Sequence, residues 1–330
     1  MGVLDIARLA SLLVRASRYP APAPIAIESP DRKTGAGAVY DLYEPHGQPL
    51  AAVIAVHGAV MTGRKDTRLA HLARCLAGSG MICAAPTLPG LARFDFDEGD
   101  VTTLESVIEE LHARFGQVGI AAFSWGGSYS LVAASRPATA PRVRFVLAIG
   151  AAWSFPDLCD SRYEKRTRPL GDGRDLDDAI YVRMAMAYRR RERLGLDPEA
   201  CSSLEDILRR YCCEASLEEK RAFHDRFLRD LDVDEVDRRF LNRRTLEAIS
   251  PAGKLGGLRC RVGLVHDRGD NLVPVSHSER IHAELLSLPN ARDHRLHVTS
   301  LLSHVSPSRL PSLGDALGVA RAIYPLVTGD

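Results

Sequence analysis

Short apolar runs recur along this chain, and stretches long enough to form a helix separate them. The runs, each bounded by turn residues, are 39–43, 51–56, 81–85, 118–123, 145–149, 261–265 and 296–298. Alternation of this kind predicts an α/β fold in which a mostly parallel sheet carries helices on both faces. Several of the runs are apolar without interruption, which is typical of strands that are buried on both faces.

The interval 155–250 interrupts this alternation. It holds 42 charged side chains among its 96 residues, whereas the other 234 residues of the chain hold 43. Its patterns are helical, because apolar side chains such as Ile180 and Met184 recur at every fourth position. We therefore expect residues 155–250 to form a helical cap insertion within a core made of residues 25–154 and 251–330.

Residues 1–24 carry an apolar series that predicts an N-terminal amphipathic helix. Asp5, Arg8 and Arg15 interrupt the series, whereas the apolar region of a secretory signal is uncharged. We expect this helix to pack on the domain, with weak contact to a membrane surface as the alternative. The apolar runs of the sequence fall short of the ~20 residues that a transmembrane helix needs, so we expect no membrane span.

Charge and cysteine usage narrow the classes of partner and compartment. Lys plus Arg number 43 and Asp plus Glu number 42, and a net charge of +1 does not favour nucleic acid as a partner. The seven cysteines form no C-x-x-C pair and no zinc-type spacing, which indicates reduced thiols and a cytoplasmic protein. The sequence has no phosphate-binding glycine motif and no metal-ligand cluster, so we expect neither a cofactor nor a metal.

A serine follows the apolar run 118–123 and precedes a helix-like stretch. A serine on a tight turn between a strand and a helix needs small residues two positions to either side, and Ser124 has Ala122 and Gly126 there. The arrangement matches the nucleophile elbow G-x-S-x-G, with alanine in place of the first glycine. We predict that Ser124 is a nucleophile; the alternative is a serine that only caps the helix.

An acid and a histidine follow Ser124 in the chain order that a Ser-Asp-His triad of this type requires. Asp270 comes after the run 261–265 and is followed by Val-Pro at the third and fourth positions. We predict that Asp270 is the acid, with Asp267 and Asp157 as alternatives. The structural alternative for Asp270 itself is an Asx-turn.

Among the histidines after Asp270, His304 alone stands on a predicted loop beyond the last strand. The others, on the preceding helix or beside that strand, are His277, His282, His294 and His297. We predict that His304 is the general base that takes the proton of Ser124.

Two backbone amides are needed to stabilise the oxyanion that forms on an attacked carbonyl group. One is the amide of Trp125, directly after the nucleophile. The loop after the run 51–56 reads His57-Gly58-Ala59, and we predict that the amide of Ala59 is the second donor. His57 is expected to brace this loop.

The chain resembles the α/β-hydrolase superfamily in four places. These are the elbow around Ser124, the His57-Gly58 loop, the segment that begins at Asp270, and His304. The resemblance covers residues 38–154 and 250–327 and implies an esterase, lipase, thioesterase or peptidase with a helical lid. The elbow also resembles that of dienelactone hydrolases, which carry cysteine where this chain has Ser124.

The sequence therefore predicts a serine hydrolase that cleaves a carboxylic ester or thioester of a small-molecule acyl substrate through an acyl-enzyme. An acyltransferase that uses the same triad is one alternative. A catalytically inactive binding protein with this fold is the other. The sequence makes no prediction of the oligomeric state.

Overall fold

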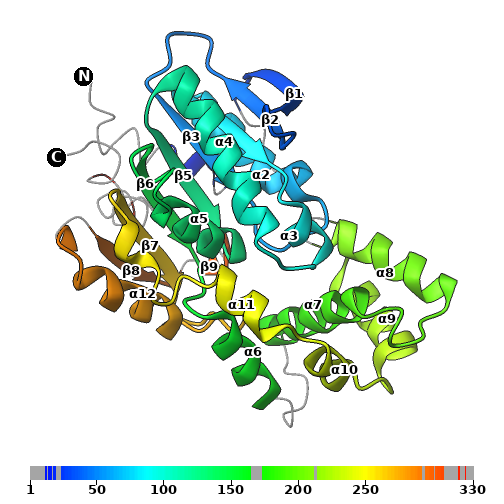
Figure 1. Cartoon of the computed structure of the whole chain (residues 1–330). Coiled ribbons are helices and arrows are strands. Elements are labelled where there is room, and N and C mark those ends of the chain that lie inside the picture. Colours follow the sequence, from blue (N-terminus) through cyan, green and yellow to red (C-terminus); the bar gives the residue numbers. More distant parts are fainter. Residues whose placement is uncertain are drawn as a thin grey trace.

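The computed structural model describes residues 12, 14–16, 18–19, 24–164, 173–211, 214–291, 294–300, 302–307, 319 and 324. Within these residues one eight-stranded sheet runs through the molecule in the order β1-β2-β4-β3-β5-β6-β7-β8 (Figure 1). The strands are β1 (Ile27–Lys33), β2 (Val39–Glu44), β3 (Ala51–Val56), β4 (Met81–Pro86), β5 (Val118–Phe123), β6 (Val143–Ile149), β7 (Arg261–Asp267) and β8 (Arg295–Thr299).

The sheet is parallel from β4 to β8, and β1 and β2 add an antiparallel edge. The predicted mostly parallel sheet is confirmed, and all seven apolar runs are strands. The first strand, β1, has no counterpart among those runs, because most of its residues are exposed and polar. Parallel strands end at a common edge of the sheet, so the loops that follow β3, β5, β6 and β7 converge there.

Helices cover both faces of the sheet, as predicted. On one face α2 (Thr67–Ala77) packs through Leu69 and Ala73, together with Leu12 near the N-terminus. On the other face lie α4 (Gly99–Phe115), α5 (Trp125–Ser135) and α12 (Ser276–Leu286), which share one buried apolar cluster with the sheet. Helix α5 is buried along its length from Gly126 to Ser135, because the sheet and other helices surround it.

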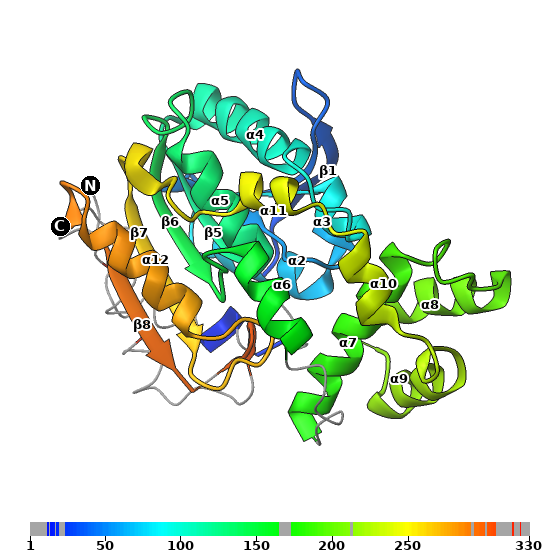
Figure 2. The ribbon, with the colours of Figure 1, turned by 60° about the horizontal axis from the view of Figure 1, so that its bottom comes forward.

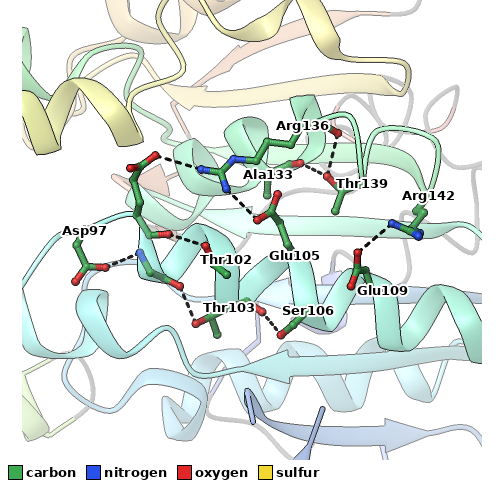
Figure 3. Close-up of polar contacts among 12 residues, drawn as sticks. Asp97, Thr102, Thr103, Glu105, Ser106, Glu109, Ala133, Arg136, Thr139 and Arg142 are labelled. Carbon is green, nitrogen blue, oxygen red and sulfur yellow. Dashed lines mark hydrogen bonds and ion pairs between the residues drawn. The ribbon is translucent and has the colours of Figure 1, made fainter. Parts of the chain in front are cut away.

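A set of ion pairs joins α4 to the C-terminal end of α5 (Figure 3). Arg136, which ends α5, donates to Glu105 at 2.9 Å and to Glu98 at 3.2 Å. Arg142 donates to Glu109 at 3.1 Å, one helical turn further along α4. Arg142 lies in the turn before β6, so the pairs connect α4 both to the end of α5 and to this turn. They are partly exposed, so each contributes little to stability.

Where the structure describes it, the interval 155–250 is helical, as its apolar periodicity predicts. Its elements are α6 (Phe155–Glu164), α7 (Gly173–Arg189), α8 (Pro198–Arg210), α9 (Leu217–Phe223), a π-helical turn (His224–Leu228), α10 (Val233–Arg239) and α11 (Arg243–Ile249). Helices α7 to α10 lie together beside the sheet in both views (Figures 1 and 2) and bury a separate apolar cluster around Met184 and Leu204. Helices α6 and α11 instead pack into the main cluster, through Phe155 and Leu246.

Most of the predicted N-terminal helix, residues 1–24, lies outside the described residues. Leu12 is buried against α2, and the carbonyl oxygen of Arg15 lies 3.0 Å from His71 Nε2 of that helix. Within the described part of the chain, the helices lack the combination of length and hydropathy that a bilayer crossing requires.

Candidate active site

Ser124 lies on a strained turn between β5 and α5. Its backbone has φ 53° and ψ −128°, a conformation that L-residues rarely adopt. Its amide donates to the carbonyl oxygen of Ile149 at 2.7 Å, which ties the turn to the end of β6. The serine hydroxyl makes no capping bond to α5, so the helix-cap alternative does not account for it.

Two glycines allow the chain to pack closely around this turn. A Cβ atom on Gly126 would lie 2.1 Å from the carbonyl oxygen of His57, which no side chain could accommodate. A Cβ atom on Gly58 would lie 3.1 Å from the Cβ atom of Ser124. Close approach of α5 to the end of β3 therefore requires Gly126, whereas Ala122, fully buried in β5, tolerates its methyl group.

His304 lies in the two-residue turn of a short hairpin, between β9 (Leu302–Ser303) and β10 (Ser306–Pro307). Its φ of 54° fits such a turn, because tight hairpins favour positive φ. Its Nε2 lies 2.8 Å from Ser124 Oγ and its Nδ1 lies 2.6 Å from Asp270 Oδ2. A Cβ atom on Gly150 would lie 3.1 Å from His304 Cε1, so this glycine leaves room for the imidazole.

Asp270 is buried, and its carboxylate accepts hydrogen bonds from the amides of Leu272 and Val273, both at 2.9 Å. Burial alone would raise the pKa of Asp270. Hydrogen bonds from His266 and His304 outweigh that effect and hold its pKa well below the usual value of 3.8. Asp270 is therefore ionised at neutral pH and can stabilise an imidazolium at His304.

His266, at the end of β7, was not singled out from the sequence. Its Nε2 lies 2.8 Å from the carbonyl oxygen of Val273 and 3.3 Å from Asp270 Oδ2, and its Nδ1 lies 2.6 Å from Ser278 Oγ. Because a carbonyl oxygen only accepts, Nε2 carries a proton and donates to Val273. A histidine at a strand end, four residues before the predicted acid, was the signal that could have found it.

The alternative acids have other partners. Asp267 is buried and accepts from the amides of Gly269 at 2.8 Å and Leu302 at 3.1 Å. Asp157 is paired with Arg280 at 2.7 Å near the surface. The structure therefore brings Ser124, His304 and Asp270 together and leaves these two carboxylates out of the contact with His304.

The other histidines after Asp270 lie elsewhere in the fold. His277 belongs to α12 and accepts from the amide of Trp153 at 3.2 Å, and His282 lies on the same helix. His294 is buried just before β8, and His297 is a residue of that strand.

One predicted oxyanion donor, Trp125, directly follows Ser124, and the other, Ala59, lies on the loop after β3. Trp125 is the first residue of α5, where amide groups point out of the helix. Its ring is stacked between Phe96 and Phe155, with ring centroids 3.8 Å and 3.9 Å away. Ala59 follows Gly58, the residue that packs against Ser124.

His57 supports the loop that carries Ala59, the role predicted for it. Its Nδ1 lies 2.6 Å from the carbonyl oxygen of Gly58, and its Nε2 accepts from the amide of Leu88 at 2.9 Å. Burial lowers the pKa of His57 to about 4, so the ring is neutral and carries its proton on Nδ1. Because the peptide between Gly58 and Ala59 is trans, this bond directs the Ala59 N–H to the opposite side.

Groups of His, Cys, Asp and Glu that could hold a metal ion are absent from the described residues. In the site a serine hydroxyl, an imidazole and an ionised carboxylate lie in hydrogen-bond contact. This is the set of groups that nucleophilic acyl transfer requires.

No family model and no curated protein matches the sequence. Solved structures resemble the fold. An esterase from Pyrococcus furiosus is 12% identical, with 92% of this chain and 90% of that chain covered and a TM-score of 0.53.

Two peptidases also resemble this chain, each over part of its own length. A puromycin-hydrolyzing peptidase from Mycobacterium tuberculosis is 14% identical, with 94% of this chain and 40% of that chain covered and a TM-score of 0.53. An acylaminoacyl peptidase from Pyrococcus horikoshii is 10% identical, with 92% and 41% covered and a TM-score of 0.50. The strand order, the turn at Ser124 and these likenesses together show that the chain has the fold of the α/β-hydrolase superfamily.

Proposed function

We propose that the protein is a serine hydrolase that cleaves a carboxylic ester or thioester of a small molecule through an acyl-enzyme. The single observation that carries this proposal is the position of the His304 imidazole, which contacts both Ser124 Oγ and Asp270 Oδ2. A neutral imidazole with its proton on Nδ1 can accept the proton of the serine hydroxyl at Nε2.

The reaction follows from these contacts. His304 Nε2 takes the hydroxyl proton while Ser124 Oγ bonds to the acyl carbon, and the amides of Trp125 and Ala59 donate to the resulting oxyanion. The carbon–oxygen or carbon–sulfur bond to the leaving group then breaks, and His304 returns the proton to the departing alcohol or thiol. Water, with His304 again as base, attacks the acyl carbon and releases the acid and Ser124. Asp270 stays ionised throughout and stabilises the imidazolium.

The proposal extends to the helical insertion, residues 155–250, as a cap over the site. Two contacts support this. Tyr181 of α7 donates a hydrogen bond to the carbonyl oxygen of Ala59, and Met61 and Phe94 from the core pack into the apolar cluster of α7 to α10. A cap in this position would supply the walls that select among acyl groups.

The test combines covalent labelling with pre-steady-state kinetics. The wild-type protein is treated with a fluorophosphonate, and we expect one adduct that maps to Ser124. With p-nitrophenyl acetate we expect a burst of p-nitrophenol equal to the enzyme concentration, and neither signal in Ser124→Ala. A label on another serine, or hydrolysis that persists in Ser124→Ala, would refute the assignment.

An acyltransferase would show the same burst, so a second measurement separates the two activities. The products are analysed after turnover in water alone and with an added alcohol or amine. Steady release of free acid in water indicates a hydrolase. Acyl-enzyme that persists in water and discharges only to the added acceptor would indicate a transferase.

A further inference from the structure

We propose that Tyr181 is a positioning residue for the oxyanion hole, through which the helical insertion sets the orientation of the Ala59 amide and thereby the rate of acylation. This inference rests on the proposed function. It assigns to one side chain of the insertion an effect on the chemical step, beyond selection of the substrate.

The backbone at Ala59 is held from both sides. The peptide before it is fixed by His57 Nδ1, which donates to the carbonyl oxygen of Gly58 at 2.6 Å. The peptide after it is fixed by the Tyr181 hydroxyl, which donates to the carbonyl oxygen of Ala59. Two successive carbonyl groups are thus bound by side chains, one from the core and one from the insertion. The Ala59 N–H belongs to the first of these peptides, and the angles φ and ψ of Ala59 join that peptide to the second. The Tyr181 bond therefore acts on the N–H indirectly, because it limits the rotations that would turn the first peptide.

Orientation of that N–H group matters more in the transition state than in the bound ester. An oxyanion donor contributes to catalysis when it is directed at the position of the developing charge, and removal of one such donor lowers kcat by about 10²- to 10³-fold. Loss of the Tyr181 bond leaves the Ala59 N–H held through His57 but frees the peptide that follows Ala59, so the N–H group can turn more easily. We therefore expect part of that effect, on acylation and without an equal effect on substrate binding.

Within the insertion Tyr181 contacts Tyr211, which is itself held by side chains of α7 and α9. Its ring lies 4.7 Å from that of Tyr211, at the end of α8, whose hydroxyl donates to Asp177 Oδ1 of α7 at 2.6 Å. Lys220 of α9 donates to the same carboxylate oxygen at 3.1 Å, and its ammonium group lies 3.6 Å from the centre of the Tyr211 ring. Lys220 is buried, so this ion pair is shielded from solvent on the lysine side. The position of Tyr181 therefore follows the packing of α7, α8 and α9 as a unit.

The experiment compares Tyr181→Phe with Tyr188→Phe in the full chain. Tyr188 lies on the same helix, about two turns further on, and its ring packs edge-on against Phe94 at 6.3 Å. Each variant keeps its ring and loses one hydroxyl. We expect Tyr181→Phe to slow the burst phase with p-nitrophenyl acetate by about 10-fold or more, with the substrate concentration for half-maximal burst rate unchanged. Tyr188→Phe is expected to match the wild type within about twofold.

A pair of inhibitors tests the orientation of the donor directly. Ser124 Oγ adds to the carbonyl carbon of a trifluoromethyl ketone, and the carbonyl oxygen becomes an oxyanion. The corresponding methyl ketone binds as the uncharged carbonyl compound. Tyr181→Phe should lower the affinity for the trifluoromethyl ketone by the same factor as it lowers the burst rate. It should leave the affinity for the methyl ketone unchanged. An equal loss for both ketones, or an unchanged burst rate in a variant with wild-type Tm, would overturn the positioning role.

Failure of the proposed function looks different from failure of this inference. Absence of the Ser124 adduct and of the burst in the wild type would refute the function and, with it, the role of Tyr181. A normal wild-type burst with an unchanged Tyr181→Phe variant would refute the positioning role alone. If Tyr181→Phe has a lowered Tm, the ketone comparison decides, because partial unfolding weakens both inhibitors equally.

Discussion

The carboxylate of Asp267, at the end of β7, accepts a hydrogen bond from the amide of Leu302, 3.1 Å away. Leu302 opens the hairpin whose turn holds His304, and Asp267 also binds the amide of Gly269 in the loop that leads to Asp270. One buried side chain therefore joins the segment that carries Asp270 to the segment that carries His304. We expect the relative position of His304 and Asp270 to depend on it.

We expect Asp267→Ala to lower kcat by about 10-fold and to destabilise the protein by about 1–3 kcal/mol, because two amides lose a buried acceptor. Thermal unfolding and steady-state kinetics with p-nitrophenyl acetate measure the two effects. The matched control is Asp157→Ala, which removes the surface pair with Arg280. A kcat in Asp267→Ala equal to that of the control would contradict the positioning role of Asp267.

Ser124 and His304 should behave as one catalytic unit. Ser124→Ala and His304→Ala are each expected to reduce ester hydrolysis by about 10⁴-fold or more, and the double variant should lose little beyond either single change. The rate constants come from hydrolysis of p-nitrophenyl acetate, corrected for the rate without protein. Losses that multiply in the double variant would show that the two side chains act independently.

The two glycines after Ser124 should tolerate alanine unequally. A Cβ atom on Gly126 meets the backbone oxygen of His57 at 2.1 Å, whereas one on Gly127 meets the methyl group of Ala151 at 3.1 Å. We expect Gly126→Ala to displace α5 or β3, with a loss of stability above about 2 kcal/mol and of most fluorophosphonate labelling. Gly127→Ala should cost less on both measures. Equal unfolding midpoints in urea for the two variants would contradict the packing seen at Gly126.

Two buried groups should give the stability opposite dependences on pH. Burial raises the pKa of Asp100 from 3.8 to about 6, although its carboxylate accepts from the amides of Gly90 and Leu91. Its contribution is fully present below pH 3.8 and is lost as the pH rises through about 6. Burial lowers the pKa of His57 from 6.5 to about 4, so its contribution is present above pH 6.5 and is lost as the pH falls through about 4.

Each of these groups changes the free energy of unfolding by at most about 1.4 kcal/mol per pH unit between their shifted and usual pKa values. Asp100→Asn removes the contribution that decreases as the pH rises. Between pH 4.5 and 6 the free energy of unfolding of this variant should therefore rise more steeply with pH than that of the wild type. His57→Gln should have the reverse effect. Urea unfolding across this pH range measures the slopes. A slope in Asp100→Asn parallel to that of the wild type would mean that Asp100 does not titrate there.

The sequence predicts the parts of this fold that depend on local pattern. Strands β3 to β7 are apolar runs, and Ser124, Asp270 and His304 could be chosen because each follows a strand in the required order. Strand β1 could not be predicted in the same way, because it lies at an exposed edge and has no apolar periodicity.

The contacts that support the site could not be predicted, because they join residues far apart in the chain. The bond from Tyr181 to Ala59 spans 122 positions, and that from Leu302 to Asp267 spans 35. Nothing in the local sequence around Tyr181 or Asp267 marks either residue as a partner of a distant backbone group. Only the folded chain shows these contacts. For His304, the sequence predicted a loop beyond the last strand. It did not predict the hairpin that gives His304 its positive φ.

Among the described side chains, the apolar cluster of α7 to α10 meets the core at Met61, Phe94, Ala59 and Phe96. A unit attached in this way can open without exposing the main cluster, so its amides should exchange with deuterium well before those of β5 and α5. Each opening would also break the bond between Tyr181 and Ala59. The population of competent enzyme would then be set by a local unfolding equilibrium. Activity would then be lost at a lower temperature or denaturant concentration than the one at which the main core unfolds.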